Sequence, residues 1–300
     1  MDIARTPYDA LPSSVLAELD AAGVPPRPVY DAIVLALDED LPGGATDVTS
    51  DATIPADAHG AADLAAREPG TVAGLGVAEL VFHYVMGRDV AVSGRVPDGT
   101  RVARGDVVMQ VSGPVRGLLT AERTALNFMQ RMTGVATLTR QFVDAAAGRI
   151  TILDTRKTTP LMRVLEKYAV RAGGGVNHRF GLADGILIKD NHVRLAGGVS
   201  NAVARMRASQ PTMAIEVEAQ RLSEVAEALH AGADIVLLDN LSTADIVDAV
   251  KQCRGRAKTE ISGGVTLARM PELTATGADY VSIGALTHSA PAADLSFEME

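Results

Sequence analysis

Short apolar runs alternate with helical patterns through the second half of the chain. Each run holds about four or five residues and is followed by polar residues, and helical periodicity separates the later runs. Buried strands that alternate with helices are typical of parallel sheets. The runs that we interpret as strands are 150–153, 185–188, 214–217, 234–238, 257–261 and 280–283.

The last four of these strands end at a nearly constant spacing. The steps from Glu218 to Asp239, Ser262 and Gly284 are 21, 23 and 22 residues, which is the length of one strand and one helix. A complete (β/α)₈ barrel needs eight such units. The pattern supplies six, so we predict an α/β fold whose residues 148–300 form an open or incomplete barrel of about six parallel strands.

The first part of the chain has a different pattern, which predicts an N-terminal α+β domain over residues 1–118. Residues 102–111 alternate as a strand pair with a turn at 104–106. Other expected elements are helices at 29–37 and 77–86, a loop at 41–47, and strands at 61–67 and 90–93.

Residues 119–147 are predicted to form connecting helices. Thr120 is suited to cap the first turn, and Gly134 is expected to break the segment into two helices. Arg123 shares a polar face with Asn127 and Gln130. Pairing of Arg123 with Glu122 is one explanation of that face, and a binding role is the other.

Composition excludes several classes of function. The net charge of −9 argues against nucleic acid or an anionic membrane as a partner. A single cysteine, Cys253, excludes an internal disulfide. No segment approaches the roughly 18 uncharged apolar residues of a membrane span, and the start lacks the apolar core of a signal peptide. We therefore expect a cytoplasmic enzyme.

Positive charge is concentrated in one segment. Residues 151–200 hold eight Lys and Arg against four acids, a balance of +4, which leaves −13 for the remainder. A basic segment in an acidic protein favours a small, highly anionic ligand, although an ordinary basic surface is the alternative.

The carboxyl ends of parallel strands form the working face of a barrel. Glu218 and Asp239 end neighbouring strands, so their carboxylates are candidates for Mg²⁺, bound directly or through water. Ser262, Gly263, Gly264 and Gly284 follow the last two strands, where loops commonly bind phosphate through backbone N–H groups. Ordinary strand ends and plain turns are the alternatives.

The cations of the same face follow the first two strands. Arginine offers a two-pronged contact to carboxylates, and lysine acts as a point charge. Thr159 and Pro160 are expected to start a helix whose residues Arg163, Lys167 and Arg171 form one basic stripe, and we expect Lys167 and Arg171 to be solvated. The cations that we expect to hold an anion are Arg156, Lys157, Arg179 and Lys189, with His178.

These motifs resemble quinolinate phosphoribosyltransferase (carboxylating nicotinate-nucleotide pyrophosphorylase). The likeness covers about residues 28–290. It departs from the family at Leu161, where a glycine is expected. The matching segments include Asp154-Thr-Arg-Lys-Thr-Thr-Pro160, Gly173-Gly-Gly-Val-Asn-His-Arg179 and Leu187-Ile-Lys-Asp-Asn-His192, with 122–127, 215–218, 237–240, 261–264 and 282–289.

The resemblance implies an N-terminal α/β sandwich, a C-terminal open α/β barrel, and transfer of phosphoribosyl from phosphoribosyl pyrophosphate to quinolinate with decarboxylation. It implies a homodimer in which Arg123 enters the neighbouring active site, and it leaves open a higher oligomer of dimers. The implied quinolinate ligands are Arg123, Arg156, His178, Arg179 and Lys189.

The resemblance also implies a site for Mg²⁺–phosphoribosyl pyrophosphate at Glu218 and Asp239, with Lys157 nearby. Lys157, Lys189, Glu218 and Asp239 are thereby the expected catalytic residues. The 5′-phosphate is expected on Ser262, Gly263, Gly284 and His288.

Two other functions match part of the sequence. A paralogue that acts on another heteroaromatic acid stays open on sequence grounds. Residues 99–113 resemble the hairpin of biotinyl or lipoyl carriers, but no lysine precedes Lys157, and the carrier function is therefore excluded.

Overall fold

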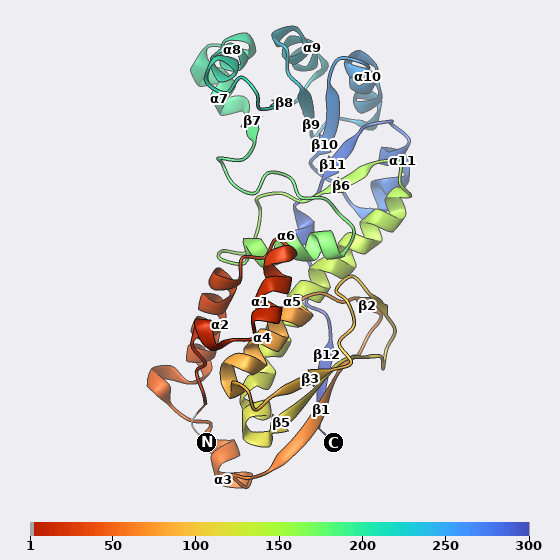
Figure 1. Cartoon of the computed structure of the whole chain (residues 1–300). Helices are drawn as coiled ribbons and strands as arrows, with labels where there is room; N and C mark the ends of the chain where they lie inside the picture. The colour runs from red at the N-terminus through yellow and green to blue at the C-terminus, as the bar shows by residue number, and fades with distance from the viewer. Residues whose placement is uncertain (1–2, 300) are drawn as a thin grey trace. The chain divides into compact units, whose positions relative to one another are not determined.

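The computed structural model describes residues 3–299 and consists of two compact units (Figure 1). The first unit comprises the chain up to Leu138, Pro160–Gly173, and the chain from Ala290. The second unit comprises Thr139–Thr159 and Gly174–Ser289. The units are therefore interleaved along the chain, whereas the sequence pattern predicted contiguous domains with boundaries near 118 and 148.

The second unit is built on a six-stranded parallel sheet in the order β6-β11-β10-β9-β8-β7. Every predicted strand is present, and the pairing leaves β6 and β7 at opposite edges, so the sheet is an open one. The prediction of six parallel strands is confirmed. The strands are β6 (Thr151–Leu153), β7 (Ile186–Ile188), β8 (Ile215–Ala219), β9 (Ile235–Asp239), β10 (Lys258–Ser262) and β11 (Tyr280–Ser282).

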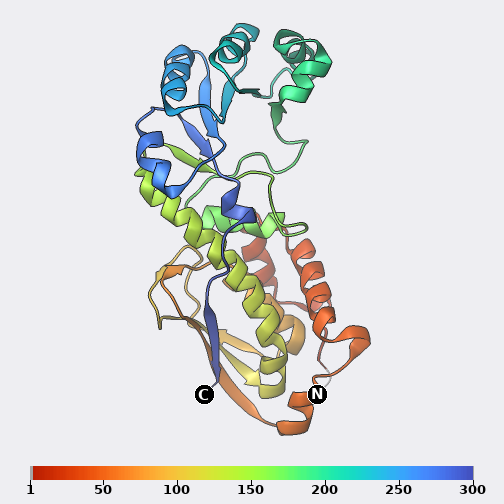
Figure 2. The same ribbon diagram turned by 180° about the vertical axis from the view of Figure 1, so that it is seen from behind.

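Helices connect these strands. Figures 1 and 2 show α8, α9 and α10 side by side along one face of the sheet, and α9 contacts both β8 and β9. Ser242 caps α10 by accepting a hydrogen bond from the Asp245 N–H, and Gly232, with φ 84°, ends α9. The helices are α7 (Asp190–Ala196), α8 (Val199–Ser209), α9 (Leu222–Ala231), α10 (Thr243–Cys253), α11 (Met270–Thr274) and α12 (Ala285–His288), with the 3₁₀ turn η3 (Leu267–Arg269).

The first unit holds a four-stranded antiparallel sheet in the order β12-β1-β5-β3. The last strand of the chain, β12 (Leu295–Met299), lies beside β1 (His59–Ala66), as Figure 1 shows. The other strands are β2 (Gly70–Thr71), β3 (Ala91–Ser93), β4 (Arg101–Val102) and β5 (Val107–Pro114), and the helices are α1 (Ser13–Ala21), α2 (Pro26–Asp40), α3 (Val48–Thr53), α4 (Leu75–Met86) and the turns η1 (Tyr8–Ala10) and η2 (Pro42–Gly44).

The strand pair expected over residues 102–111 is wrong in its pairing. Both strands form, but β4 pairs with β2, and β5 pairs with β1 and β3. The turn between them is hydrogen-bonded to the end of β1, because the Gly105 N–H donates to the Ala66 carbonyl. Local alternation predicts a strand but not its partner, which tertiary packing selects.

The expected break at Gly134 is also wrong, since α5 (Val115–Ala146) is one continuous helix. A Cβ at Gly134 would lie 1.9 Å from the Pro291 carbonyl oxygen, so glycine permits the C-terminal segment to approach the helix. Thr120 does not cap the helix: it lies inside it, and its hydroxyl donates to the Arg116 carbonyl at 2.8 Å. Within residues 3–299 no helix combines the length and apolarity needed to cross a bilayer.

Helix α6 (Arg163–Ala172) begins three residues after the expected start at Pro160. Leu161 instead has φ 66°, in the left-handed region where a glycine would be unstrained. The predicted solvated stripe is wrong at Lys167, which is fully buried. Its neighbour Glu166 is buried too and accepts hydrogen bonds from the Arg131 guanidinium at 2.6 and 2.9 Å.

Asp279 ties β10 to the turn before β11. Its carboxylate accepts hydrogen bonds from the Lys258 ammonium at 2.6 Å and from the Thr259 N–H at 2.9 Å. Burial raises the pKa of this carboxyl, but these hydrogen bonds outweigh burial and the pKa lies below its usual value. The carboxylate therefore contributes stability above the unfolded pKa of about 3.9, and this is lost as the pH falls through the folded pKa.

Asp279→Asn should consequently lower the free energy of unfolding by about 1–2 kcal/mol at pH 7, because a hydrogen-bonded charge is removed. The difference from the original chain should shrink below about pH 4. Urea unfolding across this pH range measures both. Asp248→Asn, at an exposed carboxylate on α10, is the control, with an expected effect within about 0.5 kcal/mol. Equal effects of the two substitutions at pH 7 would contradict the assignment.

Candidate active site

A cavity of about 650 Å³ lies at the carboxyl ends of the strands in the second unit. The cavity brings together side chains that are far apart in sequence, from Thr155 to Ser282, because parallel strands end at one edge of their sheet. Ten predicted site residues line it: Arg156, Lys157, His178, Arg179, Lys189, Glu218, Asp239, Ser262, Gly263 and Gly264.

Three predicted site residues are not part of this lining: Arg123, Gly284 and His288. Gly284 is the N-cap of α12, and a Cβ there would lie 3.0 Å from Lys157 Cδ and 3.1 Å from His288 Nε2, so Gly284 adjoins both of these side chains. Arg123 belongs to α5 in the first unit, is 58% exposed and lies 3.7 Å from the Glu122 carboxylate.

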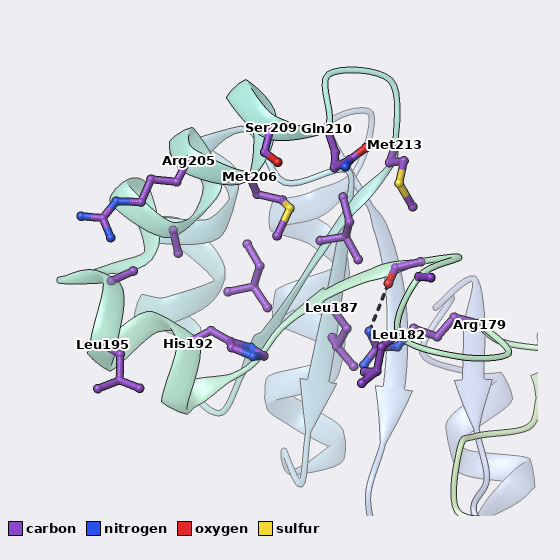
Figure 3. Close-up of a pocket in the computed structure, with 16 residues that line it drawn as sticks. Arg179, Leu182, Leu187, His192, Leu195, Arg205, Met206, Ser209, Gln210 and Met213 are labelled. Carbon is purple, nitrogen blue, oxygen red and sulfur yellow. Dashed lines mark hydrogen bonds between the residues drawn. The ribbon is translucent and has the colours of Figure 1, made fainter.

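A second cavity, of about 810 Å³, is formed by β7, α7 and α8 (Figure 3). Its labelled side chains include Leu195, Met206 and Met213. It shares Arg179 with the first cavity, and the Arg179 guanidinium donates to the Gly185 carbonyl at 3.1 Å, the dashed line in Figure 3. Without carboxylates in its lining, this larger cavity is less suited to catalysis.

The acidic side of the first cavity is formed at neighbouring strand ends. Glu218 lies 3.4 Å from the Lys189 ammonium, and Asp239 accepts a hydrogen bond from the Asn240 amide at 3.1 Å. Among residues 3–299, the second oxygen of each carboxylate has no hydrogen-bond or ion-pair partner. Hard oxygen ligands that face a cavity fit a Mg²⁺ ion, which retains several waters.

The basic side places two guanidinium groups near each other. Burial and then the charge of Arg156 lower the pKa of Arg179, which means that the two cations repel one another. Lys157 is held through its backbone: its N–H donates to the Thr155 hydroxyl at 3.0 Å, and its carbonyl accepts from the Thr287 hydroxyl at 2.7 Å. An anion that enters the cavity would relieve the repulsion between the cations.

The two glycines after β10 have left-handed backbone conformations, which leave room for a ligand to approach the chain. Gly263 has φ 86° and Gly264 has φ 58°, both left-handed. Asn240, with φ 57°, reaches across from β9, and its N–H donates to the Ser262 carbonyl at 2.9 Å. A Cβ at Gly263 would meet the Asn240 side-chain oxygen at 2.2 Å. Asn240 therefore packs against the loop and also contacts Asp239.

Glu216 and Glu260 belong to the site but were not predicted as site residues. Both are buried, and their carboxylates lie 3.1 and 3.5 Å from His178 Nε2. Burial lowers the pKa of His178, but its hydrogen bonds to Glu216 and Glu260 outweigh burial and raise the pKa to about 10. Burial raises the pKa of Glu216. Acidic residues at buried strand positions, two before Glu218 and Ser262, were the available signal.

Comparisons with known proteins match the chain to one enzyme family in two successive parts. A family model for the quinolinate phosphoribosyl transferase N-terminal domain matches residues 47–133, and one for the C-terminal domain matches residues 135–298. The chain is 44% identical to a nicotinate-nucleotide pyrophosphorylase [carboxylating] of Mycobacterium leprae, covering 90% of this chain and 96% of that protein. It is 42% identical to quinolinate phosphoribosyltransferase [decarboxylating] 1b of Nicotiana tabacum, covering 92% and 84%.

Solved structures of similarly named proteins resemble this chain over most of its length. The crystal structure of NadC from Streptococcus pyogenes superposes with a TM-score of 0.87 at 40% identity, covering 92% of this chain and 97% of that one. The nicotinate-nucleotide pyrophosphorylase from Francisella tularensis gives a TM-score of 0.87 at 37% identity, covering 91% and 96%.

Gly263→Ala should displace Asn240 and weaken binding of inorganic phosphate by about tenfold or more, the equivalent of one lost hydrogen bond to a charged ligand. Isothermal titration calorimetry measures this. Gly255→Ala is the matched control, because Gly255 is also left-handed, at φ 74°, but a Cβ there has no atom within 4 Å. Backbone strain of about 1–2 kcal/mol affects both variants. Equal phosphate affinities in the two variants would contradict a phosphate role for this loop.

Proposed function

The chain belongs to the quinolinate phosphoribosyltransferase family, and we infer from this that it transfers phosphoribosyl from phosphoribosyl pyrophosphate to quinolinate. The products are nicotinate mononucleotide, pyrophosphate and carbon dioxide, in NAD biosynthesis. The observation that supports this best is one cavity that holds clustered cations, strand-end carboxylates and left-handed glycines together. These are the groups that a dianionic acid and a phosphorylated sugar require.

The quinolinate carboxylates are assigned to the cations of the cavity. Arg156 and Arg179 repel each other in the absence of an anion, and Lys189 adds a third charge beside Glu218. A second carboxylate gives the dianion an advantage over a monoanionic pyridine acid at such a site. His178 lines the cavity as well, with Nε2 directed to buried carboxylates.

Phosphoribosyl pyrophosphate is assigned to the opposite side of the cavity. The 5′-phosphate would bind the loop of Ser262, Gly263 and Gly264, with Gly284 and His288 alongside Lys157. Glu218 and Asp239 would hold Mg²⁺ directly or through water. When bound, that ion neutralises the charge that accumulates on the leaving pyrophosphate.

The side chains then act by position and charge. Glu218 and Asp239 face the ribose as positive charge develops at C1, and Lys157 and Lys189 hold the anionic groups of the two substrates. The pyridine nitrogen attacks C1 as pyrophosphate leaves. The resulting pyridinium stabilises the carbanion that is left at the ring carbon when the adjacent carboxylate departs as carbon dioxide. A proton from solvent then takes the place of the carboxylate at that carbon. The reaction requires no nucleophilic side chain, so orientation accounts for most of the catalysis.

Arg123 is assigned to the active site of a second copy, which makes the enzyme a homodimer with shared sites. Its exposure of 58%, with a 3.7 Å approach to Glu122 as its ion-pair contact among the described residues, leaves the guanidinium accessible. A cytoplasmic location is part of the same proposal.

Turnover should occur with quinolinate and not with nicotinate or nicotinamide, each supplied with phosphoribosyl pyrophosphate and Mg²⁺. The reason is that the cation cluster matches two carboxylates. Release of carbon dioxide and pyrophosphate is measured for each substrate. Comparable turnover of nicotinate would reject the assignment, and turnover of another heteroaromatic acid alone would favour a paralogue.

Substituting both Glu218 and Asp239 with Ala should abolish the Mg²⁺-dependent reaction, because the two strand-end carboxylates are removed together. A Mg²⁺ titration of initial rates measures this. Glu227→Ala combined with Asp248→Ala, at exposed helix positions, controls for the loss of two charges. Unchanged activity across the titration would show that these carboxylates do not support the metal–substrate complex.

Mixed dimers test the sharing of the site. Arg123→Ala and Lys189→Ala chains should each be inactive, since loss of one contact to a desolvated carboxylate costs roughly 2–5 kcal/mol. After the two variants are dissociated and reassociated together, one site of each mixed dimer has both defects and the other is intact. Activity should therefore return, toward about half per mixed dimer. Each variant reassociated with itself is the control, and no recovery in verified mixed dimers would place Arg123 in its own chain's site.

A further inference from the structure

His178 is enclosed by carboxylates from three strands of the second unit. Its Nε2 lies 3.1 Å from Glu216 on β8 and 3.5 Å from Glu260 on β10. Its backbone N–H donates to Asp154, which follows β6, at 2.9 Å. All three acids are at least 97% buried. The proposed reaction uses none of these acids, although Glu260 lines the substrate cavity.

The hydrogen bond at the other ring nitrogen, Nδ1, determines whether Nε2 carries the ring proton. The Arg179 backbone N–H donates to His178 Nδ1 at 2.8 Å, so Nδ1 presents a lone pair. An Nδ1 that accepts leaves the ring proton on Nε2, which therefore donates to Glu216 and Glu260. The Arg179 contact thus keeps Nδ1 unprotonated and opposes the second protonation of the ring that the two carboxylates favour when they raise its pKa. The ligand atoms of His178, Glu216 and Glu260 lie within 4.8 Å of one another, but a protonated Nε2 cannot coordinate a metal ion.

The same contacts connect the buried acids to a cation of the cavity. Nδ1 of His178 holds the backbone N–H of Arg179, the residue whose guanidinium lines the cavity and donates to Gly185. The Asn177 amide donates to Asp154 at 2.6 Å, so residues 177–179 are fixed from both sides.

Stability alone does not explain this arrangement. Buried carboxylates are costly, and Oε1 of both Glu216 and Glu260 is buried without a hydrogen-bond partner among residues 3–299. Unpaired buried oxygens are rare in folded proteins, so two of them beside one imidazole call for a reason other than stability.

We propose that Glu216 and Glu260 are positioning residues for the substrate's carboxylates: through His178 they set the backbone from which Arg179 reaches into the cavity. This inference rests on the proposed function for the identity of the substrate. It assigns the two acids to recognition of quinolinate and gives them no part in binding phosphoribosyl pyrophosphate.

Glu216→Ala and Glu260→Ala, separately and together, should each raise the KM for quinolinate by about tenfold or more, the effect of losing one hydrogen bond to a charged group. The KM for phosphoribosyl pyrophosphate should stay within about twofold. The Gln variants retain an oxygen that accepts from Nε2–H and should recover most of the quinolinate affinity. Glu227→Gln on the exposed face of α9 is the control.

The kinetic pattern separates the alternatives. A fall in kcat with both KM values unchanged would overturn the proposal and place the carboxylates at the ribosyl cation instead. Equal rises in both KM values would indicate a general loss of structure and would overturn it as well. Stoichiometric binding of Mn²⁺ or Zn²⁺ that is lost in Glu216→Ala but retained when Glu218 and Asp239 are both Ala would show a metal centre, which the proposal excludes.

A measurement that needs no activity keeps this inference distinct from the proposed function. In proton–nitrogen NMR spectra of the full chain, the His178 Nε2–H should give a downfield, slowly exchanging signal. The signal should persist in the Gln variants and disappear when both acids are Ala. If the signal behaves in this way but quinolinate is not turned over, the substrate assignment fails while the positioning network stands. Absence of the signal in the unsubstituted chain would refute the network itself.

Discussion

Repulsion among cations gathered at one end of a parallel sheet is the constraint on which the site depends. Burial and then the charge of Arg156 lower the pKa of Arg179, so the two guanidinium groups disfavour each other at the cavity wall. Buried and partly buried carboxylates offset part of this repulsion, with Glu218 beside Lys189 and with Glu216 and Glu260 beside His178. The remaining positive charge makes an anionic ligand favourable, in a protein whose overall charge is −9.

The fold makes that concentration of charge possible. Each strand of the open sheet delivers polar residues to the same edge, while apolar positions such as Val217, Val236 and Ile261 are buried within the unit. Asn240 shows how closely the edge is organised, because it contacts both Asp239 and the glycine loop after β10. A substitution at one strand end therefore affects ligands held by its neighbours.

Much of the second unit could be predicted from sequence because its signals are local. A buried strand, its polar end and the following helix lie within about 22 residues, and parallel topology brings such ends together. Three features could not be predicted: the different partner strands of β4 and β5, the continuity of α5 through Gly134, and the burial of Lys167. Each depends on a segment distant in sequence, as the approach of Pro291 to Gly134 shows. Glu216 and Glu260 escaped prediction because a charged residue at a buried strand position gives no indication of its partner.

The most direct test of the account is a crystal structure of this protein with quinolinate bound. The account predicts that both carboxylates lie in the 650 Å³ cavity against Arg156, Arg179 and Lys189, with His178 still bonded to Glu216. Quinolinate bound in the 810 Å³ cavity beside Met206 and Leu195, with the strand-end cations uncontacted, would contradict it.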